Sequence, residues 1–354
     1  MGIDQDSITI GTGNDRGGIA TLGAGRGIGG AVVAVADHCN SLGGLAGREI
    51  VVIDYAAAVV EIDDRFAQAC TEVFAMVGHR FLLAAEAASA AEACPLPDFA
   101  SGPLLRSPFP LHGHLAAAFA APASSSVVLV GPDTTVSAFE RLRRLAALAE
   151  SPVPLATEGT IAYPVDRPPD WAQIVADARA TGAGVVHLEG GCDHAIVPFL
   201  TAAASAGWDP IVLAGVSAYD PACLTVGDLT DRLLIELPLL PYEDGDAAPA
   251  TQEHGALFDA IGTPRTGEAL LAASAFWRWV VVSAECGEDH DRDCVTGGAA
   301  VEDWTGGGLH PAMGDDETME PCVVVMAVSE GTFVRRLPAE PGVYDCTPEW
   351  AVEL

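Results

Sequence analysis

The sequence predicts an α/β fold of two Rossmann-like lobes, each a parallel sheet with helices on both faces. Strand-like runs bounded by glycine or proline alternate with alanine-rich segments of helical length, which is the pattern of parallel sheets. The alternation stops in an irregular, proline-rich stretch at 94–114 and then starts again. The chain has 354 residues, half of them hydrophobic, which suffices for two domains with a core each.

The expected elements follow this alternation along the chain. In the first half we expect strands at 7–13, 48–56 and 73–79 and helices at 25–40, 61–73 and 83–93. After the proline-rich stretch we expect strands at 125–133, 184–191 and 210–217 and helices at 135–149 and 196–208. The remainder predicts two more helices within 255–285 and a β-hairpin over 322–337 that turns at Glu330-Gly331.

A glycine cluster, TLGAGRGIGG at 21–30, imitates the phosphate-binding turn of a dinucleotide enzyme. Asp54 closes the next strand, as such a site requires, so an NAD(P)-dependent oxidoreductase of the short-chain type stays a weaker alternative. The first strand, however, ends near Gly11, about ten residues too early for a tight turn onto a pyrophosphate. The chain also has no lysine to lower the pKa of a catalytic tyrosine. We therefore expect the glycines to let a helix start close against a neighbouring backbone.

The charge balance limits the classes of partner and chemistry. With 49 acidic and 17 basic residues, the formal net charge is −32. Nucleic acid and anionic lipid are bound through cationic contacts, so we expect neither as a partner. Every basic residue is arginine, which removes mechanisms that need a lysine base or Schiff base. No catalytic triad or carboxylate pair stands out, and we expect no enzyme activity, no cofactor and no metal.

Nine dispersed cysteines without a CxxC pair fit disulfides in an oxidising compartment. The pairs expected are Cys39–Cys70 at the ends of the first two helices, Cys286–Cys294 in an acidic loop, and Cys192–Cys223, which would leave Cys94 as the odd thiol. A metal in the acidic loop at 285–294 is the alternative, but the spacing lacks the glycine and closing glutamate of a calcium loop. We expect His112, His114 and the arginine run at 141–144 to lie at the surface.

The segment VVAVADHCNSLGGLAGREIVVIDYA at 32–56 joins a helix to a strand through a double glycine and AGR. It resembles the helix-turn-strand of the type I periplasmic binding proteins, the branched-chain amino-acid (Leu/Ile/Val) receptor family. VFAMVGH at 73–79 is similar to the family's third strand, and 170–224 to the helix-strand run of its second lobe. CVVVMAVSEGTFVRRLPAEPGVYDC resembles the terminal hairpin of actinobacterial members, which implies a Cys322–Cys346 disulfide.

The resemblance implies the type I periplasmic binding protein fold, in which two lobes are joined by a three-segment hinge and the ligand binds in the cleft between them. The lobes would be 1–122 with 250–318, and 123–249 with 319–354. The implied function is an extracytoplasmic solute-binding protein that delivers a small-molecule ligand to an ABC-transporter permease. A removed signal peptide and a lipid anchor upstream would accompany that location. A ligand-sensing regulatory domain of the same fold is the alternative.

Loops at the carboxyl ends of the expected strands supply the candidate ligand contacts, because open α/β sheets bind ligands there. The first-lobe candidates are Asn14, Arg16, Leu22, Arg80, Phe81, Leu82 and Ser101, and the second-lobe candidates are Thr135, Cys192, Asp193, Ser217 and Tyr219.

The sequence departs from the amino-acid-binding pattern at both ends of such a ligand. Family members place serine and threonine hydroxyls for the ligand carboxylate where this chain has the run RFLL at 80–83, and their acidic anchor falls near Val216 or Ser217, where no acid stands. Because a buried ammonium without an anion is costly, we expect an apolar or aromatic ligand rather than a branched-chain amino acid. Arg80 or Arg16 would meet a ligand carboxylate; the alternative is that both pair with nearby acids in solvent.

Overall fold

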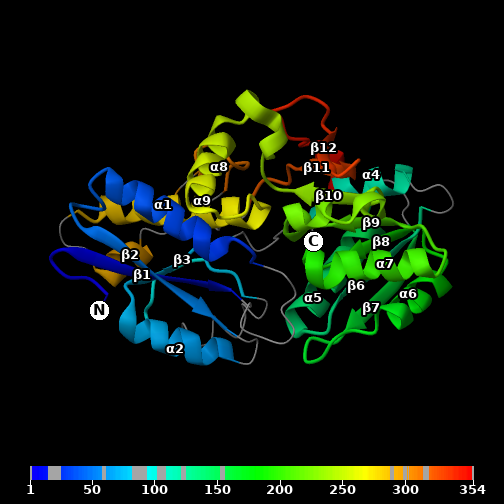
Figure 1. The fold of residues 1–354 in the computed structure, drawn as a ribbon, viewed down its shortest axis with the longest axis horizontal. Helices are drawn as coiled ribbons and strands as arrows, with labels where there is room; N and C mark the ends of the chain where they lie inside the picture. Colours follow the sequence, from blue (N-terminus) through cyan, green and yellow to red (C-terminus); the bar gives the residue numbers. More distant parts are fainter. Residues whose placement is uncertain are drawn as a thin grey trace. The chain divides into compact units, whose positions relative to one another are not determined.

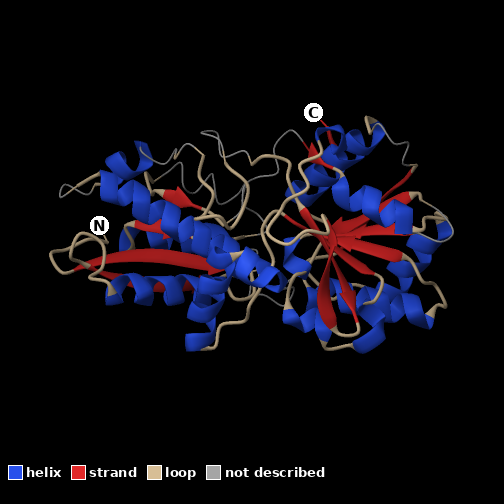
Figure 2. Cartoon of the chain, turned by 90° about the horizontal axis from the view of Figure 1, so that it is seen from above, coloured by secondary structure: helices blue, strands red, loops and turns tan. Residues whose placement is uncertain are grey.

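The computed structural model divides the chain into two compact units, Met1–Leu104 with Pro249–Met319, and Leu105–Ala248 with Glu320–Leu354. The residues described are 2–14, 25–57, 61–81, 94–101, 109–120, 125–151, 156–287, 291–297, 301, 303–313 and 319–352. Each unit is an α/β sheet structure (Figure 1), with helices on both faces of its sheet (Figure 2). The chain passes between the units three times.

Unit 1 is built on a four-stranded parallel sheet with the strand order β2-β1-β3-β4. Its strands are β1 (Ser7–Asn14), β2 (Glu49–Ala56), β3 (Ala75–Val77) and β4 (Asp98–Phe99), and its helices are α1 (Ile28–Ser41), α2 (Ile62–Glu72), α8 (Pro249–Ile261), α9 (Gly267–Glu285) and α10 (Arg292–Gly297). The register aligns Ser7 with Glu49 and Asn14 with Ala56, so β1 and β2 end at the same edge of the sheet.

Unit 2 is built on a seven-stranded sheet with the order β12-β11-β10-β9-β8-β6-β7, in which β6 to β10 run parallel and β11 and β12 run antiparallel. The strands are β6 (Val127–Pro132), β7 (Thr157–Tyr163), β8 (Val185–Leu188), β9 (Ile211–Ala214), β10 (Leu233–Leu237), β11 (Val324–Ser329) and β12 (Thr332–Leu337). The α-helices are α4 (His112–Ala120), α5 (Thr135–Ala149), α6 (Trp171–Ala180) and α7 (Val197–Ser205); a short ladder joins β5 (Phe109–Pro110) to β13 (Ala351–Val352). Short turns are η2 (Cys192–Ile196), which is π-helical, and η3 (Val216–Ala218), η4 (Pro221–Leu224), η5 (Gly227–Thr230), η6 (Tyr242–Ala247) and η7 (Pro348–Trp350), which are 3₁₀.

The two-lobed α/β prediction is confirmed, and three details of it need comment. The segment at 105–122, expected in the first lobe, groups with unit 2, because α4 packs on β8 to β11. The strand β7 was not expected, since TEGTIAY has few large apolar residues and lies half-exposed at the sheet edge. The helix expected at 83–93 lies outside the described residues.

The glycines at the start of α1 allow close packing, as the sequence indicates. A Cβ on Gly29 would lie 2.1 Å from Asp54 Oδ2, and one on Gly30 would lie 2.2 Å from Thr263 Oγ1. Gly25 and Gly27 both have positive φ, which favours glycine. Asp54, the acid that a ribose site would need, therefore faces the first turn of α1 instead.

Helix α5 carries charge on its buried face and apolar groups on its exposed face. Arg141 and Arg144 are only 4% and 8% exposed, whereas Phe139 and Leu142 are 60% and 62% exposed. The expectation of a solvated arginine run is therefore wrong for Arg141 and Arg144. Carboxylates of the sheet explain the inversion, because the Arg144 guanidinium interacts electrostatically with Glu236 and Glu189.

His112 and His114 are fully buried, which corrects the expectation that they lie at the surface. They occupy the first turn of α4, which packs on β8, β9, β10 and β11. The His114 ring stacks on the ring of His187 from β8, with centroids 4.9 Å apart. Burial lowers the pKa of both His114 and His187 well below the ordinary value, and the positive charge of Arg144 lowers it further.

The structure pairs eight of the nine cysteines. The disulfides are Cys70–Cys94, Cys192–Cys223, Cys286–Cys294 and Cys322–Cys346. Three of these pairs are those expected, but the Cys39–Cys70 prediction is wrong. Cys39 is a buried free thiol, and Cys94 is not the odd cysteine because the segment before β4 brings it to the end of α2.

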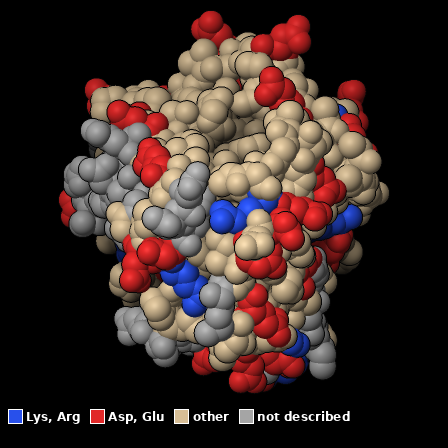
Figure 3. Space-filling model, turned by 90° about the vertical axis from the view of Figure 1, so that its left-hand side faces the viewer, with Lys and Arg blue, Asp and Glu red and all other residues tan. Residues whose placement is uncertain are grey.

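Among the described residues, no helix is long and apolar enough to cross a membrane. On the face drawn in Figure 3, acidic side chains spread over the surface and basic ones form small groups. That distribution agrees with the net charge of −32.

Candidate functional site

The carboxyl edge of the unit 1 sheet brings together Asn14, Arg80 and Ser101 from three chain segments. Asn14 ends β1 and forms a parallel bridge with Arg80, whose N–H donates to Gly13 O at 3.0 Å. Ser101 lies just past β4, where its N–H and its hydroxyl both donate to His79 O, at 2.8 and 3.1 Å. These contacts follow from parallel pairing of β1, β3 and β4, which ends all three strands at one edge.

Glu268 joins this edge from the first turn of α9. Its side chain is buried, and its carboxylate accepts from Gly25 N–H and lies 3.6 Å from Arg80 Nε. Asn14 Nδ2 donates to Gly25 O at 2.8 Å, so Gly25, three residues before α1, is held by two side chains. The Arg80 side chain stays 36% exposed, and within the described part of the chain its terminal Nη atoms have no hydrogen-bond partner. The arrangement therefore presents one edge of a guanidinium that a buried carboxylate holds in place.

Among the described first-lobe candidates, Arg80 is partly exposed, whereas Asn14 and Ser101 are buried at 1% and 4% exposure. Phe81 is 4% exposed and packs in the core of unit 1, with its ring 5.6 Å from Phe66 and 5.4 Å from His79. Its hydrophobic neighbours include Tyr55 and Met76, so the side chain stabilises the unit rather than lining an open surface. Arg16, Leu22 and Leu82 lie outside the described residues.

The carboxyl edge of the unit 2 sheet holds the other candidates. Thr135 begins α5 directly after β6, Asp193 lies in η2 after β8, and Ser217 lies in η3 after β9. Thr135 and Asp193 are exposed and Ser217 is half-buried, so all three side chains reach the surface of this unit. Because β6, β8 and β9 are neighbours in the sheet, their following loops lie side by side.

Cys192 and Tyr219 are buried, so they hold the loops of this edge in place rather than lie at its surface. Cys192 is bonded to Cys223. The Tyr219 hydroxyl donates to the Glu243 carboxylate and accepts from Tyr242 N–H at 2.8 Å, and its ring lies 4.7 Å from the ring of Phe333. Burial raises the pKa of Tyr219 well above the ordinary value, and the charge of Glu243 raises it further. Tyr219 therefore stays a neutral hydrogen-bonding group.

Solved structures of known proteins identify the fold. The substrate-binding protein LivJ of a branched-chain amino acid transporter from Streptococcus pneumoniae, in complex with isoleucine, matches with a TM-score of 0.72 over 94% of this chain and all of its own, at 13% identity. The leucine-binding protein LivK from Thermotoga maritima gives 0.71 over 93% of this chain and 97% of its own, at 17% identity. A fatty acid ABC transporter substrate-binding protein from Thermomonospora curvata gives 0.77 over 99% of this chain and 95% of its own, at 14% identity. No protein-family model and no curated protein matches the sequence.

The chain has the type I periplasmic binding protein fold. The fold expected from the sequence is therefore confirmed. In such open α/β sheets the crevice outside the carboxyl ends of the strands is the usual ligand position. Of the candidates at these ends, Arg80 in unit 1 and Thr135, Asp193 and Ser217 in unit 2 reach the surface, whereas Asn14 and Ser101 are buried.

The unit 2 edge also carries a polar group around Glu189 that the sequence analysis did not predict. Glu189 follows β8, and its carboxylate accepts from the Ser137 hydroxyl, which accepts in turn from Arg141 Nη1 at 3.0 Å. The Tyr163 hydroxyl donates to Glu189 O at 2.7 Å. Burial raises the pKa of Glu189, while the Ser137 hydrogen bond and the nearby arginines act in the opposite direction. No described set of three or more His, Cys, Asp or Glu residues could hold a metal ion in this fold.

Proposed function

We propose that this protein is an extracytoplasmic solute-binding protein of an ABC importer, and that its ligand is a small organic carboxylate with an apolar or aromatic body. It delivers this ligand to a permease without chemistry. The observation that carries the ligand class is the Arg80–Glu268 arrangement at the carboxyl edge of unit 1. The general role is supported by the fold and by the transporter names of the proteins that share it.

Arg80 has the properties of an anion anchor. A guanidinium binds a carboxylate through its planar edge, and charge-assisted bonds of this kind are stronger than neutral ones. Glu268 contacts Arg80 through Nε and leaves the two Nη atoms for a ligand. In a chain with a net charge of −32, an anion needs such a dedicated cation to offset the general repulsion.

The carboxyl edge of the unit 2 sheet lacks a partner for the ammonium group of an amino-acid ligand. An ammonium group needs a carboxylate partner when it is buried. Val216 and Ser217, where the amino-acid receptors carry an acid, offer only a buried aliphatic side chain and a hydroxyl. Glu189 is engaged by Ser137 and lies under α5. The ligand that we propose therefore carries a carboxylate for Arg80 and no ammonium group.

The extracytoplasmic location is supported by the four disulfides, since such bonds persist in oxidising compartments. As part of the same proposal, the protein is exported by a signal peptide and held by a lipid anchor. The test is fractionation of the native host, in which the protein is expected outside the cytoplasm with its disulfides formed. A cytoplasmic, fully reduced protein would contradict the transport proposal.

A thermal-shift screen tests the ligand class. The panel contains aromatic, fatty and steroid acids, each beside its neutral amide, together with leucine and valine. An acid at about 100 times its Kd is expected to stabilise the protein by roughly 2.7 kcal/mol, and its amide much less. If leucine or valine gives the largest shift, or if the amides match the acids, the proposed ligand class is wrong.

A further inference from the structure

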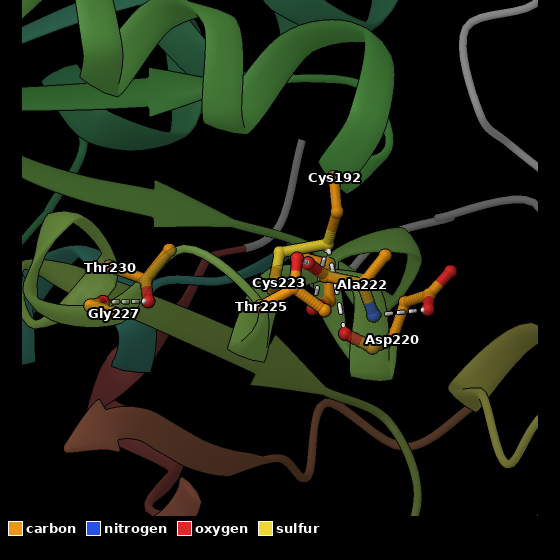
Figure 4. Close-up of a disulfide and its surroundings, with 8 residues drawn as sticks. Cys192, Asp220, Ala222, Cys223, Thr225, Gly227 and Thr230 are labelled. Carbon is orange, nitrogen blue, oxygen red and sulfur yellow. Dashed lines mark hydrogen bonds between the residues drawn. A yellow bond between two sulfur atoms is a disulfide. The ribbon is translucent and has the colours of Figure 1, made fainter. Parts of the chain in front are cut away.

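The Cys192–Cys223 disulfide crosses the carboxyl edge of the unit 2 sheet. It joins η2, which follows β8, to η4, which lies in the connection from β9 to β10 (Figure 4). The two residues are 31 positions apart in sequence and 5.2 Å apart between Cα atoms. Both are almost fully buried, with Cys192 at 2% and Cys223 at 0% exposure.

We propose that this disulfide positions the ligand-contact loops of unit 2, an inference that rests on the proposed function. Asp193 is the direct neighbour of Cys192, and Ser217 lies in the turn before the Cys223 turn. These two candidate contacts stand on separate loops, and the disulfide is the covalent link between the loops. The pair acts through Asp193 and Ser217 and need not touch the ligand.

The connection from β9 to β10 has little regular structure to hold it. Residues 215–232 contain only the 3₁₀ turns η3, η4 and η5, each of three or four residues. Such short turns have poorer hydrogen-bond geometry than α-helices and do not fix a loop by themselves. After β8, the single π-helical turn η2 runs directly into α7, and turns of this kind are rare.

Besides the packing of η5 on α7 and β11, Tyr219 and the disulfide attach this connection to the rest of unit 2. Tyr219 fixes η3 through Glu243, Tyr242 and Phe333, which lie after β10 and in β12. The disulfide fixes η4 to η2, and Cys192 Sγ also lies 3.5 Å from Ala218 O. The Asp220 carboxylate accepts from Ala222 N–H at 2.8 Å and so caps η4 between the two attachments (Figure 4). Without the disulfide, η2 loses its covalent link to η4, while the Tyr219 contacts with Glu243, Tyr242 and Phe333 remain.

A purely global role predicts a different result. A disulfide that closes a loop of this length stabilises mainly by constraining the unfolded chain. Its removal would then lower the midpoint of unfolding and leave native-state exchange of the two loops unchanged at lower temperature. A positioning role predicts local opening in the native state, far below that midpoint.

The test is hydrogen exchange in the full chain, with the double variant Cys192→Ala/Cys223→Ala. The reporters are amides that the structure hydrogen-bonds within these loops, those of Ala195, Ala218, Tyr219 and Cys223. We expect residues 192–196 and 216–224 to exchange at least tenfold faster, with the rest of unit 2 unchanged. The matched control is Cys286→Ala/Cys294→Ala, which removes a local pair only 8 residues apart in unit 1 and leaves these loops as they are.

Binding is measured on the same proteins with two probes, phenylacetate and decanoate. A probe that binds the unaltered protein is expected to bind the Cys192/Cys223 variant at least tenfold more weakly and the control variant equally well. Unchanged exchange in both loops would overturn the proposal, as would faster exchange with unchanged affinity. If neither probe binds the unaltered protein, the proposed ligand class fails, while the exchange result still decides whether the disulfide holds the loops.

The variant Cys192→Ala/Cys223→Val serves if the alanine pair does not fold. Valine fills the space that alanine would leave at the 0% exposed position 223, without restoring the bond. The same changes in exchange and affinity are expected for it. A variant that exchanges and binds like the unaltered protein would contradict the proposal.

Discussion

Arginine side chains held by buried carboxylates recur at the residue scale. Glu268 holds Arg80 in unit 1, and Asp244 accepts from Arg335 Nε at 2.8 Å in unit 2. The Arg335 pair is almost fully buried, whereas Arg80 remains 36% exposed. The Asp244–Arg335 pair therefore ties two segments of unit 2 together, whereas the Glu268–Arg80 pair leaves a partly exposed cation, which we propose binds an anion.

Replacing Arg80 with methionine tests this assignment. The change removes one charge-assisted contact with a ligand carboxylate, worth about 1.5–3 kcal/mol, so affinity for the acid found in the screen is expected to fall about 10- to 150-fold. Calorimetric titration measures it. The matched control is Arg65→Met on α2, which removes the same charge from a 40% exposed side chain and should leave affinity unchanged. Equal losses in the two variants would mean that only net charge matters.

His310 is a buried neutral histidine that makes unit 1 sensitive to acid. Its Nδ1–H donates to Pro311 O at 2.8 Å, so Nε2 accepts from the Ser274 hydroxyl at 2.7 Å. Burial lowers the pKa of His310 to about 4, and the charge of Arg278 contributes. The unfolded chain has an ordinary histidine pKa near 6.5, so it binds the proton first as the pH falls. The stabilisation is therefore complete above about pH 6.5 and is lost towards pH 4.

The variant His310→Gln is expected to flatten this dependence. Between pH 7.5 and pH 5, the unaltered protein should lose roughly 2 kcal/mol of unfolding free energy that the variant does not lose. Urea unfolding at both pH values measures the difference, and the exposed residue His194 supplies the control, His194→Gln. A variant that loses as much stability as the unaltered protein would show that His310 does not contribute to the acid sensitivity.

The sequence predicts some of these residues and not others, for a physical reason. Asn14, Arg80 and Ser101 follow strands, so strand ends alone place them at one edge. Glu268 could not be assigned to this edge, because its partner Gly25 lies 243 positions away and only tertiary packing joins them. The motif at 265–268 does indicate a helix start, with Thr266 as N-cap and an acid in the first turn.

At the scale of elements, the turn between α1 and β2 shows which glycines the fold needs. Gly44 and Gly47 have similar φ values of +72° and +77°, but a Cβ on Gly44 would lie 2.0 Å from Arg48 O, and one on Gly47 would meet nothing within 4 Å. Both positions favour glycine for its backbone. Of these two, Gly44 also lies against the backbone before β2. Comparing the two positions therefore distinguishes the cost of backbone strain from the cost of a steric clash.

The pair Gly44→Ala and Gly47→Ala tests that distinction. Gly47→Ala is expected to cost about 1–2 kcal/mol from the left-handed backbone alone. Gly44→Ala should cost about 1–3 kcal/mol more, because a backbone oxygen cannot yield as a side chain can. Chemical denaturation measures the loss of unfolding free energy in each variant. Equal costs would mean that the turn relaxes away from Arg48.

Periodicity predicts most elements but fails where burial reverses the usual pattern. The bounds of α5 were predicted because Thr134 caps it and alanine and leucine fill it. Its orientation was not, since Arg141 and Arg144 turn inward to carboxylates of the sheet that sequence spacing does not reveal. The same reversal buries His114 under this sheet, against His187.

At the scale of the whole molecule, the two units are alike in design. Each has a sheet of parallel strands, extended in unit 2 by two antiparallel strands, and its carboxyl edge carries polar side chains on irregular loops. The repeat of this pattern, after a proline-rich stretch, is what made the two-lobed fold predictable from the sequence. The ligand was not equally predictable, because a pocket depends on which side chains meet across segments that lie far apart in the chain.

The central claim is that the protein retains an organic carboxylate and does not transform it. Equilibrium dialysis against the acids of the screen, followed by mass spectrometry of the recovered molecule, tests this most directly. We predict saturable retention of about one equivalent per chain, recovery of the acid chemically unchanged, and no retention of NAD. Retention of NAD with micromolar affinity, a chemically altered acid, or no retention of any carboxylate would contradict the account.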